Sequence, residues 1–299
     1  MEETPFEVIG GVYQILEDEE NLLGEGVFGK VYRGRFLNEK HTNVAVKVIE
    51  VESFSYIKFK LLSQLKEVHH CNLLATFDVI KSRCTHHIVT ELCSGNLTTY
   101  LKKMGGKLDI RATHNLAKQL ACGIEVLHSE NIVHHNIKPS NILTIENSAQ
   151  VTFKLADFCL SDVMPQTFLS QKWNDQLYIA PELLIEDYSR FDRADIWSLG
   201  LVLCLAATGS YPMSTQDWHR AFLCVRIGQA RFRLQLPDHL DDLLTALLND
   251  MLIYYYRQRM TVDQFINDPF VRNRGLTDDQ LLTETTTATG YLTSGLYST

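Results

Sequence analysis

The chain of 299 residues is predicted to fold as an α+β protein with two lobes, a small antiparallel sheet that carries one helix and a larger, mainly helical lobe. Two features of the sequence predict this class. Strand-like, valine-rich segments fill the first third, and helical spacing of apolar residues takes over from about residue 96. With 45% hydrophobic residues, the chain is long enough to bury a core in each lobe around a shared cleft.

The sheet lobe is predicted from short segments rich in β-branched residues. Strands are expected within 21–36, around a glycine cluster, and over 43–51, 76–80 and 87–92. Residues 56–68 place apolar side chains at helical spacing, so a single helix should pack on this sheet.

The helical lobe should begin after a joint at about 91–96, where Gly95 follows a strand. Apolar residues recur at helical spacing over 116–127, on a helix that should end before Asn131. An apolar run over 196–207 is too short to span a bilayer, and we expect it to form a helix buried in the core. A ligand is expected in the cleft between the lobes.

The ends of the chain differ in character from its middle. From about residue 283 the sequence is Thr, Ser, Gly and Tyr, with no charge after Glu284, which predicts a flexible tail. The expected organisation is an N-terminal extension over 1–16, one domain over 17–271 (sheet lobe about 17–91, joint about 91–96, helical lobe about 97–271) and the tail over 272–299.

Composition and charge exclude several classes of partner. With 28 basic and 36 acidic side chains the net charge is −8, which argues against nucleic acid as a partner. The 7 cysteines include no Cys-x-x-Cys pair, so neither a disulfide framework nor a zinc module is indicated. The scattered cysteines fit a reducing, cytoplasmic compartment best. The first residues carry no secretory signal pattern, and the longest apolar run is too short to span a membrane.

A glycine-rich segment runs Leu23-Gly24-Glu25-Gly26-Val27-Phe28-Gly29-Lys30-Val31. Glycine clusters of this kind are often plain hairpin turns. Strand sequence on both sides indicates a lid over phosphates, where missing side chains let backbone amides approach phosphate oxygens, in place of the strand-to-helix turn of a dinucleotide site.

A lysine stands inside an apolar strand in Val44-Ala45-Val46-Lys47. A lone strand lysine is commonly a solvated edge charge. Since its neighbours are apolar on both sides, Lys47 needs an anionic partner such as nucleotide phosphates to offset its burial.

Four further segments complete a pattern: His134-His135-Asn136-Ile137-Lys138-Pro139-Ser140-Asn141-Ile142-Leu143, Leu155-Ala156-Asp157-Phe158-Cys159, Ala180-Pro181-Glu182, and Asp195-Ile196-Trp197-Ser198-Leu199-Gly200. Their order and spacing resemble the protein kinase superfamily over about residues 17–271. The form Ile-Lys-Pro-x-Asn is similar to that of serine/threonine kinases. The resemblance implies a two-lobed kinase fold that binds ATP and Mg²⁺.

By this resemblance, each retained residue has an expected role at the nucleotide. Lys47 pairs the α and β phosphates, Lys138 belongs to the catalytic loop, and Asn141 and Asp157 hold magnesium. Thr90 is the gatekeeper, and backbone groups of Glu91 and Cys93 meet the adenine. The glycines of the hairpin cover the phosphates: Gly24, Gly26 and Gly29. Three apolar residues form a column that adenine completes: Val31, Ala45 and Leu143.

The resemblance also implies two structural arrangements inside the fold. Glu182 is expected to pair with Arg259 and close the larger lobe. Leu65, Phe77 or its neighbour, His134 and Phe158 are expected to stack as one internal column.

The catalytic loop departs from the family's pattern at its most important position. Asn136 stands where the family has an aspartate that accepts the proton of the substrate hydroxyl. An asparagine amide can orient the hydroxyl but takes no proton at neutral pH.

Other departures point the same way. Leu61 stands where the family's helix glutamate would orient Lys47, and His135 replaces the arginine that receives a phosphorylated activation segment, here at Thr167 or Ser170. Cys159 replaces the glycine of Asp-Phe-Gly, and Asn174-Asp175 replace a Gly-Thr pair near the substrate. The sequence therefore favours a pseudokinase that binds nucleotide and regulates or scaffolds a protein partner, such as another kinase. The alternative is a weakly active serine/threonine kinase acting on protein substrates, with Asp175 or His135 as a substitute base.

Overall fold

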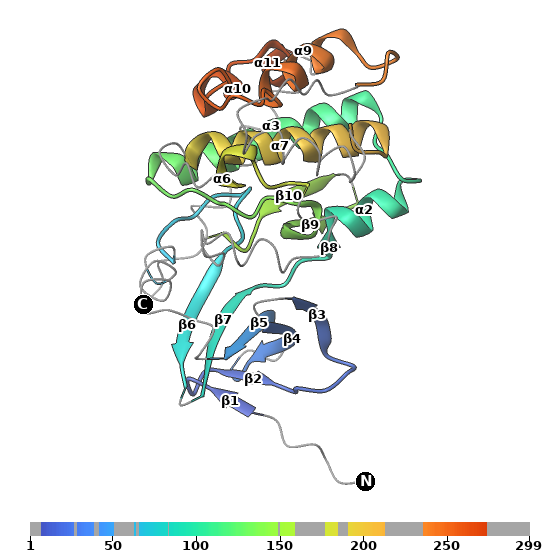
Figure 1. Ribbon diagram of the computed structural model, residues 1–299. Coiled ribbons are helices and arrows are strands. Elements are labelled where there is room, and N and C mark those ends of the chain that lie inside the picture. The colour runs from blue at the N-terminus through green and yellow to red at the C-terminus, as the bar shows by residue number, and fades with distance from the viewer. Residues whose placement is uncertain are drawn as a thin grey trace, which may run out of the picture.

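A computed structural model describes residues 7–26, 29–38, 42–50, 63, 66–82, 84–148, 150–158, 177–184, 191–212 and 236–273. The chain has the expected α+β, two-lobed arrangement. Figure 1 shows one lobe built of strands and another built of helices, with the short strands β8, β9 and β10 between them.

The sheet of the smaller lobe is antiparallel throughout, with strand order β1-β2-β4-β5-β7-β6 and β3 paired to β4. The four segments predicted from the sequence contain five of these strands, because the glycine segment folds back on itself as a hairpin. The bounds are β1 Glu7–Ile9, β2 Tyr13–Ile15, β3 Leu22–Gly26, β4 Gly29–Phe36, β5 Asn43–Glu50, β6 Thr76–Lys81 and β7 Thr85–Glu91.

The hairpin β1-β2 was not expected from the sequence. Gly10 and Gly11 form its turn with φ of 59° and 71°, a conformation that glycine adopts without steric cost. Alternate residues Ile9, Tyr13 and Ile15 are buried at 5% exposure or less, and they share a cluster with Val44, Val46 and Val89 of the sheet. The hairpin therefore covers one face of the smaller lobe.

The helical lobe is organised around two long helices, α3 (Ile110–Ser129) and α7 (Phe191–Thr208). The predicted apolar face of α3 is buried, the Asp109 side chain caps its first turn, and the helix ends before Asn131 as expected, since that residue has φ 58°. The remaining helices are α2 Leu97–Lys103, α6 Pro181–Leu184, α9 Asp242–Met251, α10 Val262–Ile266 and α11 Pro269–Asn273.

The apolar run over 196–207 lies inside α7 and is buried between α3 and α9, as predicted. Gly200 permits this close packing, because a Cβ there would stand 2.8 Å from Leu252 Cδ2. Among the residues that the structure describes, no helix is long and apolar enough to cross a membrane.

A small second sheet joins the lobes. Its strands are β8 Gly95–Asn96, β9 Ile142–Glu146 and β10 Val151–Leu155, and a short 3-10 helix, η2 (Pro139–Asn141), leads into β9. Asn96 also caps α2 reciprocally with Thr99, so the chain turns from strand to helix at the predicted joint.

Of the two alternatives expected for the internal column on β6, Phe77 or its neighbour, the structure excludes Phe77. The register of β6 shifts between Thr76 and Asp78, and this bulge leaves Phe77 without a partner across the ladder. Phe77 is 39% exposed and its ring lies 6.1 Å from Phe36, so it is no part of an internal column. His134 and Phe158 do stack, edge to face at 5.8 Å, while Leu65 and most of the predicted helix 56–68 lie outside the described residues.

Candidate functional site

The glycine segment forms the β3-β4 hairpin, with Gly26 paired to Gly29. Gly29 is required by the fold itself, because its φ is +129° and a Cβ there would stand 2.0 Å from the Val48 carbonyl oxygen. A Cβ added at Gly24 or Gly26 would meet no atom of the described part of the chain within 4 Å, and that part therefore does not demand glycine there. Open space beside these two positions is what a ligand approached by backbone amides needs.

The strands β4, β5 and β7 bring several predicted residues to one face. Val31 is directly opposite Lys47, and Ala45 is directly opposite Thr90. Because side chains alternate along a strand, Ala45 and Lys47 point to the same side, away from the buried Val44 and Val46. Val31 and Ala45 are half-buried, as is Leu143 on β9.

The lysine on β5 meets an acid from the other lobe. Lys47 Nζ donates to Asp157 Oδ2 at 2.7 Å, across 110 residues of sequence. The two side chains are 10% and 32% exposed. Asp157 follows β10 with φ 58°, a left-handed conformation that turns its carboxylate toward the smaller lobe.

The loop between α3 and η2 places Asn136 beside Asn141. Asn141 Nδ2 donates to the Asn136 carbonyl oxygen at 2.8 Å, and the Asn136 backbone amide donates to His134 Nδ1 at 3.3 Å. With its amide nitrogen bound to the loop, Asn141 has its side-chain oxygen as the remaining ligand atom for a cation. Asn141 and Asp157 thus each carry a side-chain oxygen of the kind that Mg²⁺ prefers as a ligand.

Asp195, at the start of α7, fixes this loop. Its carboxylate accepts from the backbone amides of His134 and His135 at 2.8 and 2.9 Å, and from His128 Nε2 at 2.8 Å. Burial acts to raise the pKa of Asp195, but the hydrogen bond and charge of His128, together with His135 and His134, outweigh it and lower that pKa. The sequence singled out the segment of Asp195 as a motif but gave no role to its carboxylate.

His135 adopts a left-handed backbone, with φ 62°, under this restraint. Burial lowers the pKa of its imidazole, opposed by the charge of Asp195 and assisted by that of His128. A lowered pKa keeps this imidazole neutral at pH 7, so His135 as a substitute base stays a prediction.

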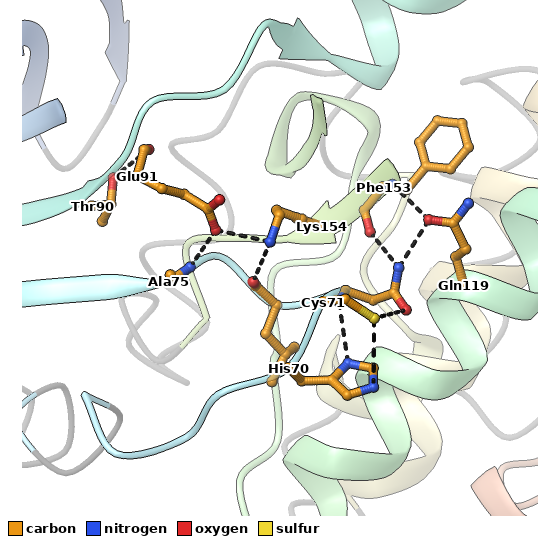
Figure 2. Close-up of polar contacts among 10 residues, drawn as sticks. His70, Cys71, Ala75, Thr90, Glu91, Gln119, Phe153 and Lys154 are labelled. Carbon is orange, nitrogen blue, oxygen red and sulfur yellow. Dashed lines mark hydrogen bonds and ion pairs between the residues drawn. The ribbon is translucent and has the colours of Figure 1, made fainter. Parts of the chain in front are cut away.

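A second inter-lobe tie was missed by sequence reasoning. Lys154 on β10 lies 2.9 Å from Glu91 Oε1 and donates to the Leu73 carbonyl at 3.3 Å, while the same Glu91 oxygen accepts the Ala75 amide at 2.7 Å (Figure 2). Lys154 is only 8% exposed. The Glu91 side chain is therefore held by the segment 73–75, and its role at this joint is structural.

The segment before β6 is attached to the larger lobe. Asn72 Nδ2 donates to Gln119 Oε1 and to the Phe153 carbonyl, each at 2.9 Å (Figure 2). Leu73 also forms a parallel bridge with Leu155. These contacts attach residues 72–73, which lead into β6, to α3 and β10.

Cys93 lies half-buried just beyond β7, at the predicted adenine position. Burial, and then the charge of Glu91, raise the pKa of its thiol to about 12. The thiol stays protonated at neutral pH and has no nucleophilic role there. Thr90 Oγ1 donates to the Glu91 carbonyl oxygen at 3.2 Å.

The predicted pair in the larger lobe is present. Arg259 Nη1 and Nη2 donate to the two oxygens of Glu182 at 2.6 and 2.9 Å, with the residues 0% and 3% exposed. Lys138 is half-buried at the start of η2. Other positions that the sequence analysis used lie outside the described residues: Leu61, Cys159, Thr167, Ser170, Asn174 and Asp175.

Comparison with known proteins agrees with this architecture. A family model described as the protein kinase domain matches residues 18–271. A crystal structure of Rad53 1-466 in complex with AMP-PNP superposes with a TM-score of 0.72 at 23% identity, covering 87% of this chain and 65% of that one. At this identity the likeness shows the fold.

Curated relatives include serine/threonine kinases. Serine/threonine-protein kinase ATG1c of Arabidopsis thaliana is 30% identical over 263 residues, which is 84% of this chain and 35% of that protein. Serine/threonine-protein kinase unc-51 of Caenorhabditis elegans is 28% identical over 270 residues, 85% of this chain and 31% of that protein. The chain thus spans about a third of the length of these relatives.

Proposed function

The chain belongs to the protein kinase family, and on that premise we propose that it is a nucleotide-binding pseudokinase, impaired in phosphoryl transfer, that scaffolds or regulates a protein partner such as another kinase in the cytoplasm. The observation that carries the proposal is Asn136 at the position of the catalytic base, beside an intact Lys47–Asp157 pair at 2.7 Å. Groups that hold a nucleotide are kept, and the group that accepts the proton is replaced.

The cost of the replacement is large on the scale of enzyme catalysis. A positioned general base contributes about 10² to 10⁴ in rate, roughly 3 to 5 kcal/mol of activation barrier. The Asn136 backbone is tied to Asn141 and His134, so the loop keeps its position while losing its carboxylate. Turnover should be slow even where binding is retained.

Several features support nucleotide binding. Lys47 is 8% exposed, and its partner Asp157 is the residue expected to hold magnesium. Nucleotide phosphates would take over the charge of Lys47 while the cation takes over that of Asp157. Bound Mg²⁺ would neutralise phosphate charge; Asn141 and Asp157 would hold it, and Gly24 and Gly26 leave room for the phosphates.

Binding is tested by thermal unfolding with and without Mg-ATP. Because a ligand that binds only the folded state stabilises it, saturating Mg-ATP should raise the Tm of the parent protein. Lys47→Met should remove the shift. Lys66→Met is the matched control, since Lys66 pairs with Asp78 at 2.8 Å elsewhere in the same lobe. A parent Tm that does not move with Mg-ATP rejects nucleotide binding.

A second function, that of a weakly active serine/threonine kinase, is favoured by one observation: Lys47, Lys138, Asn141 and Asp157 are all retained. Magnesium electrostatics and orientation carry much of phosphoryl transfer. The test is transfer of labelled γ-phosphate to a generic protein substrate, with a Lys47→Ala, Asp157→Ala double variant as the contamination control. Transfer above that control would establish an enzyme, and Asn136→Asp should then raise it strongly.

A further inference from the structure

The N-terminal hairpin ends in acidic side chains on its buried face. Glu7 on β1 pairs with Ile15 on β2, and Glu17 follows two residues later. Since side chains alternate along a strand, Glu7 and Glu17 continue the face that buries Ile9, Tyr13 and Ile15 against the sheet. Both glutamates are themselves exposed, at the rim of that face.

Beneath this rim lies a fully buried histidine. His87 on β7 pairs with Val48 of β5 and is 0% exposed. Its Nδ1 lies 3.4 Å from Ser82 Oγ, whereas Nε2 has Thr85 Oγ1 at 3.5 Å and Glu7 Oε1 at 4.0 Å. Both contacts of Nε2 are longer than an ordinary hydrogen bond. A buried ring nitrogen thus faces a carboxylate that stands beyond hydrogen-bonding distance.

We propose that Glu7, Glu17 and His87 form a binding site for a first-row divalent transition-metal ion, represented here by Zn²⁺. One ligand atom from each residue lies within 4.8 Å of the other two. Zinc takes its nitrogen and oxygen ligands at about 2.0 to 2.2 Å in a tetrahedral arrangement, so two ligands of one ion stand roughly 3.3 to 3.6 Å apart. The 4.0 Å between Nε2 and Oε1 is longer by about half an ångström, a movement that the exposed Glu7 side chain can supply.

The state of the histidine suits a ligand. Burial lowers the pKa of His87, against the charge of Glu7 and with that of His86, which favours the neutral imidazole that metals require. A proton on Nδ1, which faces Ser82 Oγ at 3.4 Å, would leave the lone pair of Nε2 on the side of Glu7. Metal-bound histidines typically direct their other ring N–H at such a neighbouring polar group.

The charge at the site is suited to a cation. Carboxylate oxygens of Glu7 and Glu17 lie within 4.8 Å of each other, and burial, followed by the hydrogen bond and charge of Glu7, raises the pKa of Glu17. Lys30, opposite Val48 in the same cross-strand row, acts in the other direction on Glu17. One ammonium against two carboxylates leaves negative charge for an ion to neutralise. A nitrogen ligand selects zinc-like ions over Mg²⁺ and Ca²⁺, which favour oxygen.

Metal at this position would tie β1 and the segment after β2 to β7. The site is separate from Lys47, Asp157 and the catalytic loop, so the inference stands independently of nucleotide binding. It predicts a metal-dependent stabilisation of the smaller lobe.

The test is thermal unfolding of the full chain with Zn²⁺ at about one hundred times its dissociation constant. The Tm of the parent should rise by a few degrees, and Mg²⁺ or Ca²⁺ should give no comparable rise. A Glu7→Gln, Glu17→Gln double variant, isosteric at two exposed positions, should lose the zinc-dependent rise. Glu20→Gln, at another exposed acid of the same segment, should keep it.

Because the chain has 7 cysteines and 11 histidines, a second measurement identifies the ligands. Co²⁺ bound at Glu7, Glu17 and His87 should lack the intense near-ultraviolet absorption of cobalt–thiolate bonds. No zinc-dependent rise in the parent, an equal rise in the double variant, or a cobalt–thiolate band each overturns the proposal.

Discussion

Two ion pairs of similar length have different surroundings. Arg259 and Glu182 are bound through two bonds with side chains 0% and 3% exposed, and Arg259 also donates to the carbonyls of Ile253 and Arg193 and lies over Trp197. Lys47 and Asp157 meet at 2.7 Å with side chains 10% and 32% exposed. The buried pair satisfies its charges permanently, whereas water or a ligand can reach the second. We therefore expect the Arg259–Glu182 pair to stabilise the fold, and the Lys47–Asp157 pair to exchange its partners when a ligand binds.

The largest loss of stability is expected when the buried pair Arg259–Glu182 is disrupted. Glu182→Ala should cost about 3 to 5 kcal/mol of unfolding free energy, because Arg259 is left as a buried, uncompensated charge. Urea unfolding measures it. Glu125→Ala, at an exposed acid on α3, is the control and should change stability by under about 0.5 kcal/mol. A Glu182→Ala cost near that of the control would show that the pair is dispensable.

Lys154→Met tests the intermediate case of Lys154–Glu91, with side chains 10% and 19% exposed. We expect a loss of about 1.5 to 3 kcal/mol, the range for hydrogen bonds to charged groups. Hydrogen exchange gives a local measurement: the Ala75 amide, bound to Glu91 Oε1, should exchange faster as Glu91 is released. Unchanged protection at Ala75 would mean that Lys154 does not position Glu91.

The buried carboxylate of Asp195 should make the unfolding free energy depend on pH. A carboxyl whose pKa is lowered by folding contributes stability that is fully present above its unfolded value of about 3.9 and is lost as pH falls through the folded value. Each unit of lowering is worth about 1.4 kcal/mol. Asp195→Asn should therefore be less stable at pH 7 and should lose less stability than the parent between about pH 5 and pH 3. Parallel pH profiles in urea unfolding would contradict this.

The smallest change in stability is expected at the exposed pair. Asp157→Asn should alter the unfolding free energy of the ligand-free protein by under about 1 kcal/mol, since solvent screens a pair that is a third exposed on one side. The same variant should abolish the Mg-ATP shift in Tm. A large destabilisation without ligand would place this pair with Arg259–Glu182.

Periodicity predicted the long elements well. The apolar spacing over 116–127 gave the buried face of α3, and the run over 196–207 gave α7, because many turns repeat one signal. The two strands of the N-terminal hairpin have 3 residues each, too few for an alternation to stand out. The signal that could have found them is the Gly10-Gly11 turn between short apolar segments.

The sequence identified the motifs of the site better than the side-chain contacts around it. Family resemblance placed Glu182 against Arg259, although the residues are 77 positions apart. The sequence analysis assigned no role to Lys154, because its burial depends on contacts with Glu91 and Leu73, which no local pattern brings together. Phe77 was misplaced because a single bulge reverses the side of the sheet that a side chain occupies.

Gly29 and Gly24 of the β3-β4 hairpin differ in the space around them, so substitutions at the two positions should have different effects in a cell. A side chain at Gly29 would collide with the backbone of β5, so an allele altered there would lose the protein together with its activity. Among the residues that the structure describes, a Cβ at Gly24 meets no atom within 4 Å, yet a side chain there would occupy the space proposed for the phosphates. A Gly24→Val variant should therefore be expressed at normal levels but fail to bind nucleotide. Its phenotype in a cell would distinguish functions that need only the folded protein from functions that need bound nucleotide.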